Sequence, residues 1–141
     1  MARSFRYIIL IIPFWIIQLS TYGQNYIGIH KDDIKKLTSK EYKGFIFEKE
    51  VKNGDRSFIK FVNVIDEQTL LFMLNQEGIC TSVSRMYNTW LYDQVVKELK
   101  ENYKKVGSDT WTEVKDGKEY EIKLKHGEWF ITVTTRPITK K

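Results

Sequence analysis

The side chains that could bind a metal ion are few in this sequence and lie far apart. Its only cysteine is Cys80, and its only histidines are His30 and His126. Zinc sites usually place two cysteines or histidines a few residues apart, and these three residues lack that spacing. We therefore expect no structural metal and no cofactor.

The sequence also shows no recognisable arrangement of catalytic residues. Ser82 and Ser84 lie in a run typical of a strand, without the Gly-x-Ser-x-Gly motif that exposes a nucleophilic serine. Cys80 has no recognisable histidine partner motif. We predict that the protein is not an enzyme. The alternative is a small secreted hydrolase, because a catalytic triad assembles in space and sequence order cannot exclude one.

Acidic residues do not suggest a catalytic pair either. They alternate with apolar or basic neighbours, as on a solvated sheet face, in Glu48, Glu50, Glu119 and Glu121. Glycoside hydrolysis would need two carboxyl groups placed inward across a cleft. No glycine-rich phosphate loop occurs in the sequence.

An aromatic cluster is the feature most suggestive of binding. Tyr87, Trp90 and Tyr92 occur together, with Arg85 nearby. Aromatic residues and arginine are enriched at protein–protein interfaces, so these four residues form the predicted binding site. The alternative is that the rings close one end of the core. A carbohydrate ligand is a variant of the same hypothesis.

The first 23 residues are typical of a secretory signal. Arg3 and Arg6 precede the apolar run Tyr7–Ile17, and small residues allow cleavage after Gly23. The alternative is a membrane anchor, but an 11-residue run interrupted by Pro13 is shorter than the roughly 20 residues of a spanning helix. We predict a secreted or periplasmic protein that is not a lipoprotein and has no membrane span after cleavage.

The remaining 118 residues are enough for one domain. They carry 21 basic and 18 acidic residues, a net charge of +3, interleaved along most segments. Nucleic-acid binding would leave a clustered basic stripe, so we expect no nucleic-acid partner. With a single cysteine the chain has no internal disulfide. Cys80 is then either buried or linked to a cysteine of another chain. We predict that it is buried, because cysteine is among the most buried residue types.

One segment has the periodicity of a long helix. Thr89–Gly107 repeats apolar residues at three- and four-residue steps. The stripe consists of Leu91, Val95, Val96, Leu99, Tyr103 and Val106. Lys104 and Lys105 suit the negative end of a helix dipole, and Gly107 suits a left-handed C-terminal residue. A second, short helix is predicted over Lys31–Ser39, where Ile34 and Leu37 would face a sheet.

The other segments predict strands joined by tight turns. The first four are Gly44–Val51, Arg56–Val64, Thr69–Asn75 and Ile79–Tyr87, and three more are Asp109–Val114, Lys118–Lys125 and Glu128–Thr135. Asn53-Gly54 predicts a hairpin whose two turn residues have positive φ. In the last strand, Trp129, Ile131 and Val133 would share one face.

These elements predict an α+β fold. The order is short helix, four strands, long helix, three strands, with an antiparallel sheet packed on the long helix and on the short N-terminal one. A single domain would cover residues 24–135, and residues 136–141 would form a frayed basic tail. The two helix-then-strands halves suggest a repeat of structure, without similarity between their residues.

Short segments of the chain resemble two known groups of proteins. Ile27-Gly28, followed by Ile34 and Leu37, resembles the short first helix of small exported domains related to the β-lactamase inhibitor protein and the outer-membrane assembly lipoprotein. That resemblance implies a helix followed by strands and no functional residue, and this chain lacks the lipidated and paired cysteines of that group. The phrases LNQEGICTSV, LKENYKKVG and DGKEYEIKLKHGEWFITV resemble small exported Bacteroidota proteins of unknown function.

The sequence thus predicts an exported, non-enzymatic module that binds a macromolecule, such as a protein of the envelope or the exterior, or acts as an inhibitor. It predicts neither the partner nor the oligomeric state.

Overall fold

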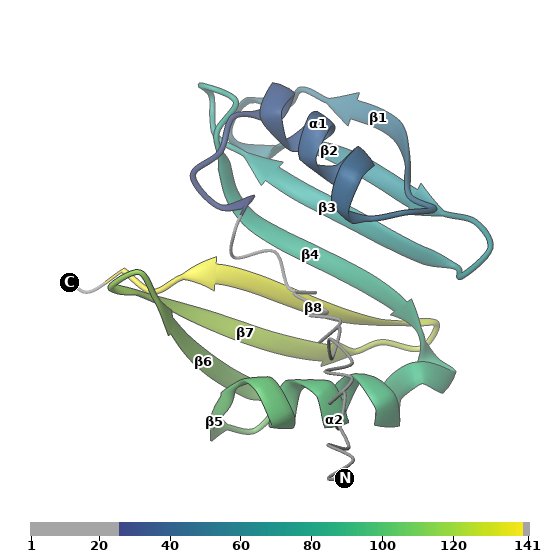
Figure 1. Ribbon diagram of the computed structural model, residues 1–141, viewed down its shortest axis with the longest axis vertical. Helices are drawn as coiled ribbons and strands as arrows, with labels where there is room; N and C mark the ends of the chain where they lie inside the picture. Colours follow the sequence, from purple (N-terminus) through teal and green to yellow (C-terminus); the bar gives the residue numbers. More distant parts are fainter. Residues whose placement is uncertain (1–25, 140–141) are drawn as a thin grey trace, which may run out of the picture.

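The computed structural model describes residues 26–139, and its main element is an antiparallel sheet of eight strands (Figure 1). The helices are α1 (Lys31–Glu41) and α2 (Tyr92–Asn102), with short 3₁₀ turns η2 (Gly54–Arg56) and η3 (Thr89–Leu91). The strands are β1 (Ile46–Val51), β2 (Ser57–Asn63), β3 (Gln68–Leu74), β4 (Cys80–Asn88), β5 (Lys104–Gly107), β6 (Thr110–Lys115), β7 (Lys118–His126) and β8 (Phe130–Pro137). The predicted signal and its cleavage site lie outside the described residues, as do the last two residues.

The sheet consists of two halves that meet at its centre. Its strand order is β1-β2-β3-β4-β8-β7-β6-β5, and every neighbouring pair is antiparallel. Each half is therefore a helix followed by a four-stranded meander, and β4 pairs with β8 to join the halves. The repeat suggested by the sequence exists in the order of the elements.

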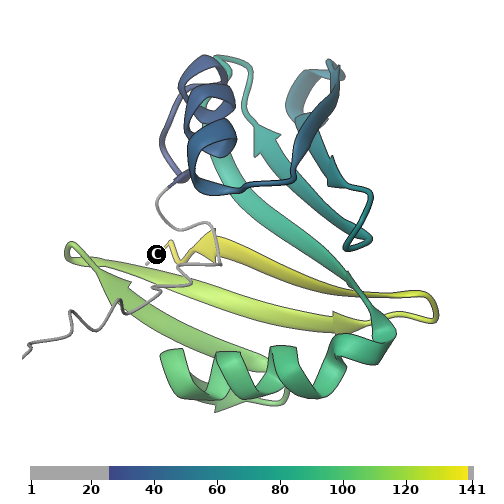
Figure 2. The same ribbon diagram turned by 45° about the vertical axis from the view of Figure 1, so that its right-hand side comes forward.

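Both helices cover the same face of the sheet (Figures 1 and 2). Residues paired across neighbouring strands share a face. Val83 pairs with Phe72 on one side and with Thr135 on the other, and Thr135 pairs with Ile122. All four side chains are buried. This helix face therefore runs without interruption across both halves, whereas side chains of the opposite face such as Leu71 and Met86 are only partly buried.

Each helix has its own hydrophobic core. Ile34 of α1 packs on one core, whose buried members are Tyr26, Ile34, Ile59, Phe61, Leu70, Phe72, Leu74, Cys80 and Val83. Val95 and Leu99 of α2 pack on the other, whose buried members are Tyr87, Val95, Leu99, Trp111, Ile122, Leu124, Ile131 and Val133. Short amphipathic helices gain most of their stability from such packing, so neither helix depends on length.

The predicted fold class is wrong, because no long helix packs on the sheet among residues 26–139. α1 and α2 have 11 residues each, and the predicted Thr89–Gly107 helix is divided among η3, α2 and β5. Tyr103 has extended backbone angles, and Gly107 lies outside the left-handed region. Lys104–Gly107 instead pairs with β6 as an eighth strand at the sheet edge.

A competing tertiary interaction explains this error. Tyr103 and Val106 continue the helical spacing, but Val106 is 55% exposed and takes no part in the core. The hydrogen bonds offered by β6 replace the last turns of the helix. Lysines are also common on edge strands, where they discourage pairing with other chains.

The antiparallel sheet is confirmed, and strands form in all seven predicted segments. The Asn53-Gly54 hairpin forms between β1 and β2, but Asn53 has φ −147° and only Gly54 has a positive φ, so its turn type was predicted wrongly. The predicted tail is ordered at its start, because Arg136 and Pro137 belong to β8 and the Arg136 guanidinium donates to Glu121 at 2.8 Å.

Candidate functional site

The predicted site residues Arg85 and Tyr87 lie side by side on the helix face of β4. The Arg85 guanidinium is 5.1 Å from the centre of the Tyr87 ring and 5.6 and 5.5 Å from the rings of Tyr42 and Phe45. It also donates to the side-chain oxygen of Gln68 at 2.6 and 3.1 Å. The arginine therefore lies between the core under α1, against which Tyr42 packs, and the core under α2, which buries Tyr87.

A small cavity of about 190 Å³ opens beside these two residues. Its lining comes from β3, β4, η3 and α2: Gln68, Arg85, Tyr87, Leu91, Gln94, Val95 and Glu98. Cavities that hold drug-sized ligands usually measure about 300 Å³ or more. This cavity is therefore suited to one inserted side chain or a small group.

The other two predicted residues, Trp90 and Tyr92, point to different surroundings. Trp90 lies in η3 and is 76% exposed, so it does not close the core. Tyr92 stacks on His126, with ring centres 4.8 Å apart and an angle of 18° between the rings, and also packs against the second core. The structure thus brings Arg85 and Tyr87 together, while Trp90 and Tyr92, on either side of Leu91, do not line their cavity.

Trp90 belongs instead to a group of exposed apolar residues at one end of the sheet. β2, β4 and β7 run in the same direction, so the turns that follow them lie at the same end, on the right in Figure 1. Asn88 at the end of β4 pairs with Phe130 and donates to Glu67 in the neighbouring turn. We call this surface the apolar end: it consists of Val64, Ile65, Trp90, Trp129 and Phe130.

The exposure of these side chains is large. The exposed fractions are 77% for Val64, 93% for Ile65, 76% for Trp90, 73% for Trp129 and 47% for Phe130. Single exposed apolar residues are ordinary, whereas a group of them contributed by neighbouring turns is typical of an interaction surface.

Most of the apolar end was not predicted from the sequence. Trp129 was predicted to lie in the last strand and to share one face with Ile131 and Val133. Instead β8 begins one residue later, and Trp129 lies in the tight turn closed by the Gly127–Phe130 backbone hydrogen bond, where it is exposed. Ile65 carried a usable signal, because it is an apolar residue between two predicted strands.

Carboxylates accompany the apolar residues in each of the three segments that form the apolar end. They are Asp66 and Glu67 after β2, Asp93 after Trp90, and Glu128 before Trp129, and all are exposed. Asp66 and Glu67 accept hydrogen bonds from the amides of Asn63 and Asn88, which leaves their charge in place. Within residues 26–139 none of the four forms an ion pair.

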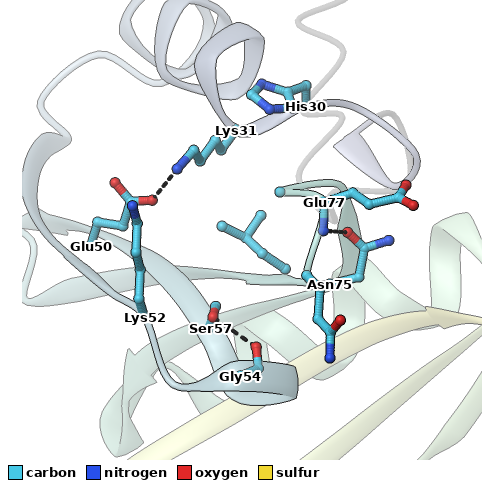
Figure 3. A pocket seen from close by; sticks show the side chains of 11 residues that line it. His30, Lys31, Glu50, Lys52, Gly54, Ser57, Asn75 and Glu77 are labelled. Atoms are coloured by element: carbon cyan, nitrogen blue, oxygen red, sulfur yellow. Dashed lines mark hydrogen bonds and ion pairs between the residues drawn. The ribbon is translucent and has the colours of Figure 1, made fainter.

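A larger cavity, of about 400 Å³, lies at the opposite end of the sheet (Figure 3). The start of α1, the end of β1 and the β3–β4 turn surround it, with Leu74 among its lining residues. Lys31 lies 2.6 Å from Glu50, and Lys35 lies 3.6 Å from the same carboxylate. The hydrogen bond from Lys31, with the nearby lysine charges, lowers the pKa of Glu50.

The turns around this cavity are held by their own hydrogen bonds. The side-chain oxygen of Asn75 accepts from the backbone of Glu77 and Ile79 at 3.0 and 2.9 Å. Gln76 donates to Asp55 at 2.9 Å. The polar groups of this end therefore bind one another.

His30 and Ser57 both line this cavity, which is the kind of juxtaposition the hydrolase alternative requires. The Ser57 hydroxyl, however, donates to the carbonyl of Gly54 at 2.9 Å, and His30 caps α1 by accepting from the backbone of Asp32. Figure 3 shows the two side chains on opposite sides of the opening. No hydrogen bond joins them among the described interactions, so the cavity does not assemble a serine–histidine pair.

Cys80 is buried, which confirms the prediction for this residue. Burial raises the pKa of its thiol to about 12, so the reactive thiolate is scarce near neutral pH. An intermolecular disulfide would require local unfolding of β4.

Across residues 26–139, no three histidine, cysteine or acidic residues lie close enough together to hold a metal ion. No helix in that part of the chain is both long and apolar enough to cross a membrane. No family model matches the chain, and no curated protein or solved structure shows significant similarity to it. The two resemblances suggested by the sequence stay untested, and function has to be argued from the residues themselves.

Proposed function

We propose that the protein is an exported, non-enzymatic binding module whose apolar end contacts another protein of the periplasm or the cell surface. The observation that carries this proposal is the gathering of Trp90, Trp129 and the Val64–Ile65 pair at one end of the sheet. Tryptophan is the residue most enriched among the side chains that dominate binding energy. The N-terminal 23 residues, typical of a secretory signal, support the proposed location.

The small cavity extends this surface toward the helix face. Leu91 lines the cavity and follows Trp90 directly in η3. A partner that covers Trp90 could therefore insert one side chain beside Arg85 and Tyr87. In this proposal three of the four residues predicted from sequence, Arg85, Tyr87 and Trp90, contribute to binding. Tyr92 instead helps to hold the start of α2 in place by stacking on His126.

Site-specific photo-crosslinking tests the proposal. A photoreactive phenylalanine analogue replaces Trp90 or Trp129, one at a time, in the full chain expressed in its native cells. The control carries the same analogue at Val114, which is 72% exposed near the opposite end of the sheet. We expect the same dominant adduct from positions 90 and 129 and none from position 114. No adduct, or equal adducts from all three positions, would refute the proposal.

A further inference from the structure

We infer that the partner presents a cationic protein segment, with lysine or arginine beside apolar side chains, to the apolar end. This inference rests on the proposed function and specifies its partner. The evidence is the repeated pairing of exposed apolar residues with carboxylates: Ile65 precedes Asp66 and Glu67, Trp90 precedes Asp93, and Glu128 precedes Trp129.

The charge of this end differs from that of the whole chain. The full sequence has a formal net charge of +5, yet residues 64–67, 89–93 and 127–130 of the apolar end carry four carboxylates. Basic residues of the adjoining segments include Lys40 at the end of α1, Lys43 before β1, Arg85 in β4 and Lys125 near the end of β7, but none lies within residues 64–67, 89–93 or 127–130. The local charge is therefore acidic on a basic protein.

Three carboxylates of the sheet itself behave differently. Glu48, Glu50 and Glu121 each form an ion pair with a basic residue of the same molecule. Those of the apolar end form none within residues 26–139. Their charges remain available to a partner, and complementary charges at an interface rim raise the association rate and exclude like-charged partners.

An anionic membrane surface fits these turns poorly. Tryptophans and aliphatic side chains can enter a lipid interface, but here each insertion would carry a carboxylate toward negatively charged headgroups. Lysines anchor many peripheral proteins to anionic membranes, but at this end carboxylates outnumber the neighbouring lysines. A cationic, partly apolar protein segment satisfies both the apolar and the acidic groups.

Binding of defined probes tests the inference. The purified protein is titrated into a fluorescein-labelled peptide of alternating lysine and leucine, and into a matched peptide of glutamate and leucine. Vesicles of phosphatidylglycerol and of phosphatidylcholine are tested by co-sedimentation. We expect binding of the lysine peptide alone, weakened by salt because screening reduces the attraction. Equal or stronger binding to phosphatidylglycerol vesicles, or to the glutamate peptide, would overturn the inference.

Charge reversal locates the effect. The double variant E67K/E128K should bind the lysine peptide about tenfold more weakly, since each reversal replaces an attraction by a repulsion. The control E77K changes an exposed glutamate in the β3–β4 turn and should bind as the unmodified protein does. Equal affinities of E67K/E128K and E77K would refute the proposed charge recognition.

The crosslinking experiment separates this inference from the proposed function. E67K/E128K is combined with the photoreactive residue at position 129. Loss of the adduct supports a cationic partner. An undiminished adduct refutes the charge inference but remains consistent with the proposed function as a binding module. Absence of the adduct in the parent chain refutes the proposed function itself.

Discussion

The two ends of the sheet differ in how their side chains are satisfied. At the end with the larger cavity, Lys31 and Lys35 neutralise Glu50, and Asn75 binds the backbone of its own turn. At the apolar end, Trp90 and Trp129 are exposed, and their neighbouring carboxylates have no ion-pair partner among residues 26–139.

This difference separates stability from recognition. Charges that pair within the molecule contribute to folding, although weakly near the surface. Apolar side chains left in water contribute nothing to the core, and a surface that gathers them is a candidate for binding. Substitutions at the apolar end should therefore change binding alone, and substitutions around Glu50 should change stability alone.

The largest effect is expected from the double variant W90S/W129S. Removing two exposed tryptophans should weaken partner binding on the order of 100-fold, because tryptophans dominate interface energies. The free energy of unfolding should change by less than about 0.5 kcal/mol, since neither ring packs in a core. Urea denaturation and binding of the crosslinked partner measure the two quantities. A large loss of stability would instead show that the two tryptophan rings stabilise the fold.

Tyr92→Ala should have the opposite effect, lowering stability while leaving partner affinity unchanged. The ring is partly buried, stacks on His126 and packs against the second core, so its loss should cost about 1–2 kcal/mol of unfolding free energy. Partner affinity should stay within about twofold of the parent for the folded protein. The control Tyr92→Phe keeps the stacked ring and should retain the stability. Lost affinity at unchanged stability would return Tyr92 to the binding site predicted from sequence.

These two residues illustrate what the sequence could and could not predict. The cluster of Arg85, Tyr87, Trp90 and Tyr92 was visible as composition, but the burial of each ring depends on where β4 ends and η3 begins. One ring is buried, one stacks at the surface and one is exposed. Spacing along the chain cannot distinguish these outcomes when a strand meets a 3₁₀ turn.

The fold shows the same limit in a different form. Strand positions could be predicted because the alternation of apolar and polar residues and the presence of turn residues are local signals. In β7, for example, every second residue is buried: Tyr120, Ile122 and Leu124. The end of α2 could not be predicted, since a helical and an extended Lys104–Gly107 are both compatible with the local pattern. Pairing with β6, a tertiary interaction, decides between them.

A smaller effect is expected from Glu50→Gln at the other end. The neutral amide loses the charge attraction to both lysines, and a surface pair of this kind contributes about 0.5–1 kcal/mol to stability. The folded-state pKa of Glu50 lies below 4.5, so this stabilisation is complete above about pH 4.5 and disappears as the pH falls through the folded-state value. Urea denaturation should therefore distinguish parent and variant at pH 7 and give a smaller difference in acid.

The control for this variant is Glu77→Gln. Glu77 is exposed, forms no ion pair within residues 26–139 and should show no such pH-dependent difference. Partner binding should be unaffected by either substitution. A difference between parent and Glu50→Gln that grows in acid would contradict the assigned direction of the pKa shift.

The smallest effect, within about 0.5 kcal/mol in stability and twofold in binding, is expected from Val114→Ser. Val114 is as exposed as Trp129, but the turn after it is Asp116-Gly117, with both residues at positive φ and no apolar side chain. If exposure alone made a binding surface, this variant would weaken binding as a tryptophan variant does. If the gathering of apolar side chains from neighbouring turns makes it, as we propose, affinity for the crosslinked partner should not change.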